Sequence, residues 1–559
     1  MLDNIKLRFG DSKCSNLDFS PQSVNVIVGP NNSGKSLLLR EILQVLNSFE
    51  NLEFSIVDEI KLRSFSKEEI TNIINLHKKR DIHNMDNYSI SILGSNGYPT
   101  HTINEETFYS AFESYNANDA YLKQFITSFL AGQSTLLLNG QTRLNSLAWK
   151  EYSTQPQLSE NYNNTVNKII NDDQLYEKLG SYIHDAFNVY PEINIDGSRA
   201  RIVLSKSKIP EHLRLSVKQE ATEFFEKAQN EENTSDGRKA YIGIISEIIA
   251  GNPNIILLDE PEAFLHPPLA RKLGSFMSKI AIEEKKQLFV STHSSDFIMG
   301  CIEAHVPINI IRLTYDNGNA IAKLLDNESL SKMMKNPLLR STNVLDGIFY
   351  KNVIVTESDS DRVFYQEINK RLKEFKPEWY IEDCLFLNAQ NKQTVGWITE
   401  ELRKIGIPTV SIVDLDLIKD GGTNFTNYLK SVNIPKNQFP GICSNRDSIK
   451  QLYPDIEKKN SVLKTQGINY LDSDNKPLLE NFLNSMNTYG LYPVPCGELE
   501  SWLSNIPTTG HGNEWITSKF DLMGDNPESD SYIKPSDDDI WFFFKQIKDW
   551  LDNPERRGM

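Results

Sequence analysis

The sequence predicts an α/β protein with two successive domains, each built around a parallel sheet. Short apolar, β-branched runs alternate with segments of helical apolar spacing, and this alternation restarts in the second half of the chain. Strands that alternate with helices are typical of parallel sheets joined by crossover helices. The predicted strands lie at 24–30, 134–144, 254–260 and 287–293 in the first half, and at 352–357, 384–390 and 409–416 in the second.

The composition is that of a soluble globular protein, with 39% hydrophobic and 24% charged residues in a chain of 559. The net charge of −16 argues against a general nucleic-acid coat protein, which would be basic. Contact with DNA or RNA would therefore need local positive patches or metal-bridged contacts. The five cysteines form no CxxC pair, which argues against a zinc site. Without a long apolar run or an apolar signal core, we expect a cytoplasmic protein that does not enter a membrane.

A phosphate-binding loop is predicted between the first buried strand and the helix expected at 36–46. The pattern is GxxxxGK[ST], and it has the strand-loop-helix setting that this motif requires. Glycines let backbone N–H groups close around phosphates, a lysine neutralises their charge, and the final hydroxyl can bind Mg²⁺. The residues of the loop are Gly29, Pro30, Asn31, Asn32, Ser33, Gly34, Lys35 and Ser36.

A second group of residues would complete a site for nucleotide hydrolysis. Four apolar residues bring Asp259 to the end of a predicted strand, where it can hold the Mg²⁺ shell. Glu260, directly after it, is placed to polarise the attacking water as a general base. His293 ends the next predicted strand and could contact the γ-phosphate.

These residues resemble the ABC-type ATPases of the SMC and RecF kind. Residues 29–36 look like the Walker A motif, 256–262 like the Walker B motif, and His293 like the switch histidine. Ser235 and Gly237 resemble the signature motif, although Thr234 and Asp236 depart from its usual pattern. The resemblance implies bound ATP and Mg²⁺, in a homodimer or higher oligomer that sandwiches ATP between ATPase domains. Gln141 and Gln133 are both candidates for the Q-loop glutamine.

Four acidic residues are expected to meet at the edge of the second sheet. Glu357 ends one predicted strand and Asp361 follows it, while Asp414 and Asp416 end another. Residues two apart on a strand share a face, and the carboxyl ends of adjacent parallel strands meet in one crevice. Carboxylates held together repel one another unless a cation binds them, so the pattern predicts a Mg²⁺ or Mn²⁺ site.

This half resembles the TOPRIM fold of topoisomerases, primases and OLD (overcoming lysogenization defect) nucleases. Residues 356–361 match the family's VEGxxD pattern with Ser358 in place of the usual glycine, and Asp414-Leu415-Asp416 matches its DxD. Lys392 lies in a turn between these motifs. The resemblance implies a later metal ligand within 497–503, where Glu500 fits best and Glu498 is its alternative.

The motifs divide the chain into three predicted parts. Residues 1–345 form an ATPase domain with a mostly helical insertion at about 50–230, residues 346–510 form the TOPRIM domain, and residues 511–559 form a helical tail. The tail contains Lys519 and Lys545, either of which could stabilise a phosphate.

Taken together, the resemblance implies an ATP-regulated, metal-dependent endonuclease that cleaves DNA. Many OLD-family proteins look like bacterial defences against phage, so the resemblance also implies an anti-phage role. A second hypothesis is an ATP-dependent sensor or scaffold that holds a separate effector or foreign protein, with a non-catalytic TOPRIM site. A RecF-like repair ATPase would not explain the second half of the chain. The sequence leaves open DNA versus RNA, the trigger and the partner.

The phosphate-binding loop gives a first prediction. Lys35→Ala should abolish ATP binding, because the phosphates lose their main cation. Equilibrium binding of a fluorescent ATP analogue measures this loss. Binding at the parental affinity would place the nucleotide elsewhere.

Overall fold

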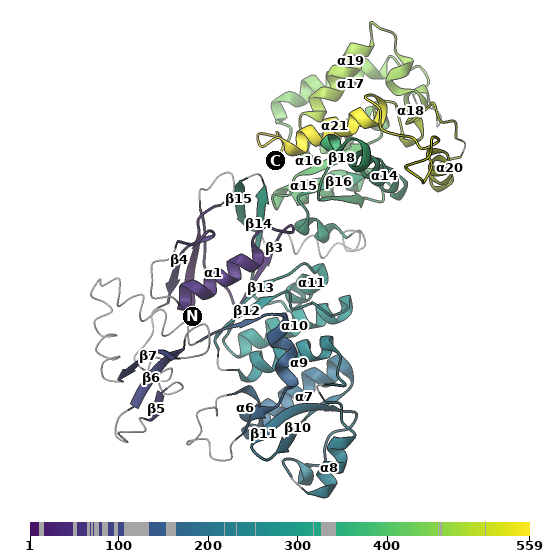
Figure 1. Cartoon of the computed structure of the whole chain (residues 1–559). Coiled ribbons are helices and arrows are strands. Elements are labelled where there is room, and N and C mark those ends of the chain that lie inside the picture. The colour runs from purple at the N-terminus through teal and green to yellow at the C-terminus, as the bar shows by residue number, and fades with distance from the viewer. Residues whose placement is uncertain are drawn as a thin grey trace, which may run out of the picture. The chain divides into compact units, whose positions relative to one another are not determined.

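The computed structural model describes residues 1–10, 16–47, 53–63, 134–152, 164–325 and 343–559, apart from isolated positions, together with short strands between 78 and 104. The chain forms two compact units, Met1–Asn327 and Glu328–Met559 (Figure 1). In the part of the chain that the structure describes, none of the helices has the length and apolar character needed to span a bilayer.

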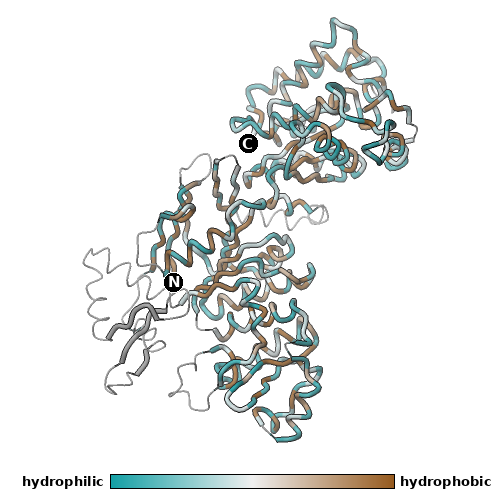
Figure 2. The backbone as a smooth tube through the Cα atoms, viewed as in Figure 1, coloured by the Kyte–Doolittle hydropathy of each residue, from teal (hydrophilic) through white to brown (hydrophobic). Residues whose placement is uncertain are grey.

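The N-terminal unit is built on a six-stranded sheet in the order β15-β14-β3-β13-β12-β8. All of its neighbouring strands are parallel except the β14–β15 pair, which is antiparallel. The central strands are apolar along their length, as Figure 2 shows, because both faces of the sheet are covered. The strands are β3 (Val24–Val28), β8 (Thr135–Leu138), β12 (Ile255–Asp259), β13 (Gln287–Ser291), β14 (Ile308–Asp316) and β15 (Asn319–Leu324).

One face of this sheet packs against α1 (Lys35–Asn47) and a small antiparallel sheet. That sheet has the order β2-β1-β4, from β1 (Leu2–Leu7), β2 (Leu17–Phe19) and β4 (Val57–Leu62). Buried Glu41 of α1 accepts hydrogen bonds from the backbone N–H groups of residues 55–57 at 2.8–2.9 Å. The helix that follows the phosphate-binding loop is therefore fixed between two sheets.

The remaining elements of the N-terminal unit mix helices and strands. The helices are α5 (Gly140–Leu144), α6 (Thr165–Asn171), α7 (Asp173–Phe187), α8 (Gln219–Glu226), α9 (Asp236–Ala250), α10 (Pro267–Glu283) and α11 (Ser295–Glu303). The strands are β5 (Lys78–Arg80), β6 (Tyr88–Leu93), β7 (Pro99–Asn104), β9 (Lys150–Glu151), β10 (Tyr190–Asp196) and β11 (Arg199–Ser205). The region predicted as a mostly helical insertion, 50–230, is not mostly helical in its described residues, because these also form strands, among them the antiparallel pair β10 and β11.

The C-terminal unit has a fully parallel four-stranded sheet in the order β17-β16-β18-β19. Its strands are β16 (Asn352–Thr356), β17 (Cys384–Asn388), β18 (Thr409–Val413) and β19 (Leu491–Pro493). Its helices are α14 (Asp359–Phe375), α15 (Lys392–Lys404), α16 (Gly422–Ser431), α17 (Phe439–Lys450), α18 (Val462–Thr465), α19 (Lys476–Asn487), α20 (Asn513–Met523) and α21 (Asp539–Asp552). The strands predicted at 352–357, 384–390 and 409–416 are all present, each ending slightly earlier than predicted.

The last 50 residues are part of the core of this unit. Trp515 of α20 and Trp541 of α21 are buried in one cluster with Phe364 of α14. Arg371 of α14 is 2% exposed and donates to the carbonyl oxygens of Met523 and Ile533 at 3.0 Å. The boundaries predicted at 345 and 510 stay predictions, but α20 and α21 share a core with the parallel sheet.

Replacing Arg371 tests this attachment. Arg371→Met should lower the stability of the C-terminal unit by on the order of 3 kcal/mol, because buried carbonyl groups lose their donor. Urea denaturation followed by tryptophan fluorescence measures the effect. Arg362→Met, which removes a more exposed arginine from the same helix, is the matched control and should cost less than about 1 kcal/mol. Equal losses in the two variants would contradict the attachment.

Candidate functional site

The phosphate-binding loop lies between β3 and α1, as the sequence predicts. Gly29 has φ 142° and a Cβ there would lie 2.0 Å from the carbonyl oxygen of Leu313, so only glycine fits. Lys35 donates to the carbonyl oxygens of Gly29 and Pro30 at 2.9 and 2.7 Å. The Ser33 hydroxyl is buried and has no hydrogen-bond partner among the described residues. An anion in the loop would supply an acceptor for both Lys35 and Ser33.

Asp259 at the end of β12 lies beside the loop. The Ser36 hydroxyl donates to its carboxylate at 2.9 Å, and the Ser291 hydroxyl at the end of β13 makes a second, short hydrogen bond to the same oxygen. The structure therefore brings together Ser36 and Asp259, the two residues predicted to hold Mg²⁺ in the nucleotide site.

Glu260 and His293 face each other from the ends of neighbouring strands. The distance between Glu260 Oε1 and His293 Nε2 is 3.8 Å, and the Glu260 side chain is 52% exposed. Glu260 has φ 49°, and its backbone N–H donates to the Ser291 carbonyl at 2.9 Å. Burial, together with the charge of Lys35, lowers the pKa of His293. His293 is therefore neutral at pH 7 and can donate a hydrogen bond without adding charge.

The strand predicted at 134–144 ends at Leu138, which changes the setting of Gln141. Asn139 accepts hydrogen bonds from the backbone N–H groups of Gln141 and Thr142 and so caps α5. Gln141 therefore lies exposed in a short helix, not at a strand end as predicted, because this cap stops the strand. Gln133, the alternative, lies outside the described residues.

The predicted signature residues lie at the start of α9. Ser235 occupies the N-cap position and is exposed, and its side chain makes no capping hydrogen bond. A Cβ at Gly237 would lie 2.6 Å from the carbonyl oxygen of Phe264, so this glycine allows α9 to approach the loop that follows Glu260. Phe264 itself is 63% exposed.

In the C-terminal unit, Glu357 and Asp414 come together after β16 and β18. A Glu357 carboxylate oxygen accepts the backbone N–H of Asp414 at 3.0 Å. Asp361 lies one turn into α14 and accepts the N–H and hydroxyl of Ser358, both at 2.8 Å. Burial raises the pKa of Glu357 to about 7 and that of Asp361 to about 6. Burial, with the charges of Glu357 and Asp361, raises the pKa of Asp414 well above its usual value.

Asp416 is not placed as predicted. β18 ends at Val413, and Asp414 begins a 3₁₀ helix (Leu415–Lys419), so the two aspartates do not share a strand face. Lys392 makes a short hydrogen bond to one Asp416 oxygen, and Lys464 Nζ lies 3.3 Å from the other. Burial opposes ionisation of Asp416, but these two lysines outweigh it and lower its pKa. Lys464 lies in no recognisable motif, so the sequence alone does not identify it as a partner of Asp416.

Glu500 and Glu498 lie on either side of Leu499 and have different partners. Glu500 accepts the backbone N–H of Gly512 at 3.0 Å and forms a short ion pair with His511. Glu498 lies 3.4 Å from Lys464. Of the tail lysines, Lys519 donates to the Leu503 and Ile506 carbonyls at 2.8 and 3.0 Å, and Lys545 pairs with Asp549.

The acidic groups fit a divalent cation by their chemistry. In the described part of the chain, no three His, Cys, Asp or Glu side chains lie close enough to form a metal site as they stand. Asp361 nevertheless raises the pKa of Glu357, both of these acids raise the pKa of Asp414, and a bound cation would relieve that repulsion. These three carboxylates are the hard oxygen donors that Mg²⁺ and Mn²⁺ prefer.

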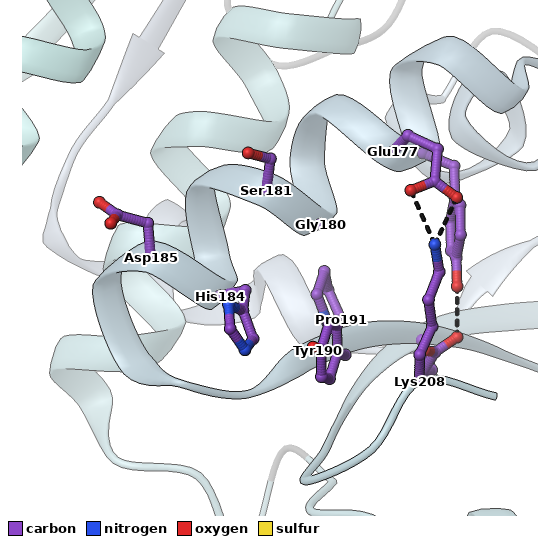
Figure 3. Close-up of a pocket in the computed structure, with 10 residues that line it drawn as sticks. Glu177, Gly180, Ser181, His184, Asp185, Tyr190, Pro191 and Lys208 are labelled. Carbon is purple, nitrogen blue, oxygen red and sulfur yellow. Dashed lines mark hydrogen bonds and ion pairs between the residues drawn. The ribbon is translucent and has the colours of Figure 1, made fainter.

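A cavity of about 310 Å³ lies elsewhere in the N-terminal unit, between α7 and β10 (Figure 3). His184 stacks on Tyr190 along its edge, and Lys208 pairs with Glu177 at 2.6 Å. None of the predicted site residues lines it.

Two family models match separate parts of the chain. Residues 139–300 match "AAA domain, putative AbiEii toxin, Type IV TA system". Residues 348–416 match "Overcoming lysogenization defect protein-like, TOPRIM domain". The chain joins an ATPase domain to an OLD-like TOPRIM domain. The predicted family resemblance and the predicted α/β fold class are confirmed.

A curated relative matches a short stretch of the chain. Over 62 residues the chain is 40% identical to the energy-coupling factor transporter ATP-binding protein EcfA2 of Staphylococcus epidermidis, which covers 11% of this chain and 21% of that protein. The chain thus spans about a fifth of the length of the curated relative that it matches.

Two similar solved structures are SMC heads. One is an Smc head bound to the C-winged helix domain of ScpA, with TM-score 0.35 and 13% identity, covering 60% of this chain and 99% of that one. The SMC head domain from Thermotoga maritima has TM-score 0.30 and 16% identity, covering 58% and 99%. Likeness at these TM-scores supports no conclusion about this chain.

The close approach of the Glu260 and His293 side chains leads to the next prediction. Glu260→Gln should keep ATP binding and slow ATP hydrolysis by roughly 100-fold or more, because the attacking water loses its general base. Phosphate release under saturating Mg²⁺ and ATP measures the rate, and size-exclusion chromatography shows whether a closed dimer accumulates. Turnover at the parental rate would remove Glu260 from the reaction.

Proposed function

We propose that this protein is an ATP-regulated, divalent-metal-dependent endonuclease that cleaves DNA phosphodiesters, acting in bacterial anti-phage defence in the cytoplasm. The observation that carries the proposal is the contact of the Glu357 carboxylate with the backbone of Asp414 at the carboxyl edge of the TOPRIM sheet, where Asp361 also acts on the charge of Asp414. The same chain has a phosphate-binding loop next to Asp259 and Glu260. Acidic clusters of this kind concentrate at functional sites, because an isolated buried charge group is costly to keep.

In the ATPase domain, Lys35 and the loop backbone would bind the phosphates, and Ser36 with Asp259 would hold Mg²⁺. Glu260 would take the proton of the attacking water, and neutral His293 would donate a hydrogen bond to the γ-phosphate. Ser235 and Gly237 at the exposed start of α9 would present a helix N-terminus to the ATP of a second subunit. We therefore propose a homodimer or higher homo-oligomer that closes on ATP.

In the TOPRIM domain, a bound Mg²⁺ or Mn²⁺ would supply an activated water and neutralise charge on the scissile phosphate. Glu357, Asp361 and Asp414 would hold it, and Glu500 is close enough to influence Asp361. Asp416 would join them once released from Lys392 and Lys464, and those two lysines, which also pair with Asp420 and Glu498, would bind backbone phosphates.

The second candidate is a sensor or scaffold that holds a separate effector. It is favoured by the pairing of Asp416 with two lysines, which occupies one of the predicted metal ligands. The net charge of −16 also suits a protein partner better than DNA. In that case the TOPRIM centre would be a structural ion-pair network.

Asp414→Ala separates these functions. If the TOPRIM centre cuts, the variant should lose metal-dependent nicking of supercoiled plasmid and keep ATP hydrolysis, because the two activities belong to different domains. Asp416→Ala and Glu357→Ala should behave in the same way, and Asp447→Ala, an exposed aspartate on α17, is the control.

The assay uses the full chain with Mg²⁺ or Mn²⁺, with and without ATP and any co-purified partner. Parental protein that never nicks the plasmid under these conditions would favour the scaffold, and the Asp414 variant should then assemble poorly.

A further inference from the structure

A fully buried arginine lies next to the residues proposed to hydrolyse ATP. Arg143 belongs to α5, two residues after Gln141, and is 2% exposed. Its Nη1 donates to the carbonyl oxygen of Glu260 at 2.9 Å. Arginine remains charged even when burial lowers its pKa. The Arg143 side chain therefore carries a permanent positive charge close to Asp259 and Glu260.

Glu262 is the strongest acidic neighbour of Arg143, ahead of Asp259 and Glu260. One Glu262 oxygen accepts the backbone N–H of His293 and the hydroxyl of Thr292, both at 2.8 Å. Its other oxygen, and Nε of Arg143, are buried without hydrogen-bond partners among the described residues. Arg143 and Glu262 therefore act on different backbone groups of the site, the carbonyl of Glu260 and the N–H of His293.

The two side chains hold the backbone of Glu260 and His293 from opposite sides. Glu260 has a left-handed φ of 49°, a conformation that a non-glycine residue keeps only when its surroundings enforce it. Arg143 fixes its carbonyl, and the Ser291 carbonyl fixes its N–H. Glu262 fixes the N–H of His293. The facing of the Glu260 and His293 side chains at 3.8 Å follows from these backbone contacts.

We infer that Arg143 and Glu262 are a pair of buried positioning residues for ATP hydrolysis, each of which holds one backbone group: Arg143 holds the carbonyl of Glu260 and Glu262 holds the N–H of His293, without contacting the nucleotide. Because α5 also carries Gln141 and packs against α9, the pair joins the candidate Q-loop and signature residues to the general base. The inference rests on the proposed ATPase function and adds two residues to it.

Kinetics of charge-altering variants test the pair. Arg143→Met should lower kcat for ATP hydrolysis by roughly 100-fold, the usual cost of a small misplacement of catalytic groups. It should leave KM and the affinity for a fluorescent ATP analogue within about threefold. Arg143→Lys, which keeps the charge, should regain about tenfold of the lost kcat.

Glu262→Gln should also lower kcat, because a neutral amide holds the backbone N–H of His293 less strongly than a carboxylate does. Arg201→Met is the control: it removes another partly buried arginine of the same unit, which stacks on Trp149 at 4.2 Å. It should keep the parental kcat.

Several results would overturn the inference. Parental kcat in Arg143→Met does so, as does a loss of kcat matched by an equal loss in Arg201→Met. If Arg143→Met fails to fold, Arg143→Lys and Glu262→Gln decide, and parental kcat in both is the negative result. A parental protein that binds ATP and never hydrolyses it removes the proposed ATPase function itself, whereas an active parent with active variants removes only the pair.

Discussion

In both units, acidic side chains gather at the carboxyl ends of parallel strands. The repulsion between these carboxylates is the constraint on the surrounding structure. The edge of a parallel sheet collects the residues that follow each strand, so Asp259 and Glu260 meet the end of β13, and Glu357 meets Asp414. Burying several carboxylates together is unfavourable unless cations compensate them. Much of the local structure around each edge supplies that compensation.

The two units compensate their acids in different ways. In the ATPase domain, buried Arg143 donates to the carbonyl oxygen of Glu260, directly after the Walker B strand. Lys35 donates to a carbonyl oxygen of the phosphate-binding loop. In the TOPRIM domain Lys392 and Lys464 both pair with Asp416, whereas burial leaves Glu357, Asp361 and Asp414 with raised pKa values. A cation bound to these three carboxylates would compensate their charge.

Local backbone geometry then decides which acid points where. β18 stops at Val413 and turns into a 3₁₀ helix, so Asp414 is directed to Glu357 and Asp416 to the lysines. Likewise, the Asn139 cap ends β8 and starts α5, which places Arg143 under Glu260 and leaves Gln141 exposed. In both units a strand that ends several residues earlier than predicted changes which neighbours the charged side chains contact.

The sequence by itself determined the two-domain α/β fold, the strand preceding each acid, and the pairing of Ser36 with Asp259, because these follow from local apolar runs and from motifs within short segments. It could not determine the partners of Asp416, since Lys392 and Lys464 are 24 and 48 positions away and only the packing of α15 and α18 brings them together. The same holds for Arg143, which no motif marks, and for the contact of Glu262 with the backbone of His293. Long-range charge compensation is decided by tertiary structure, because it depends on which buried groups the fold places side by side.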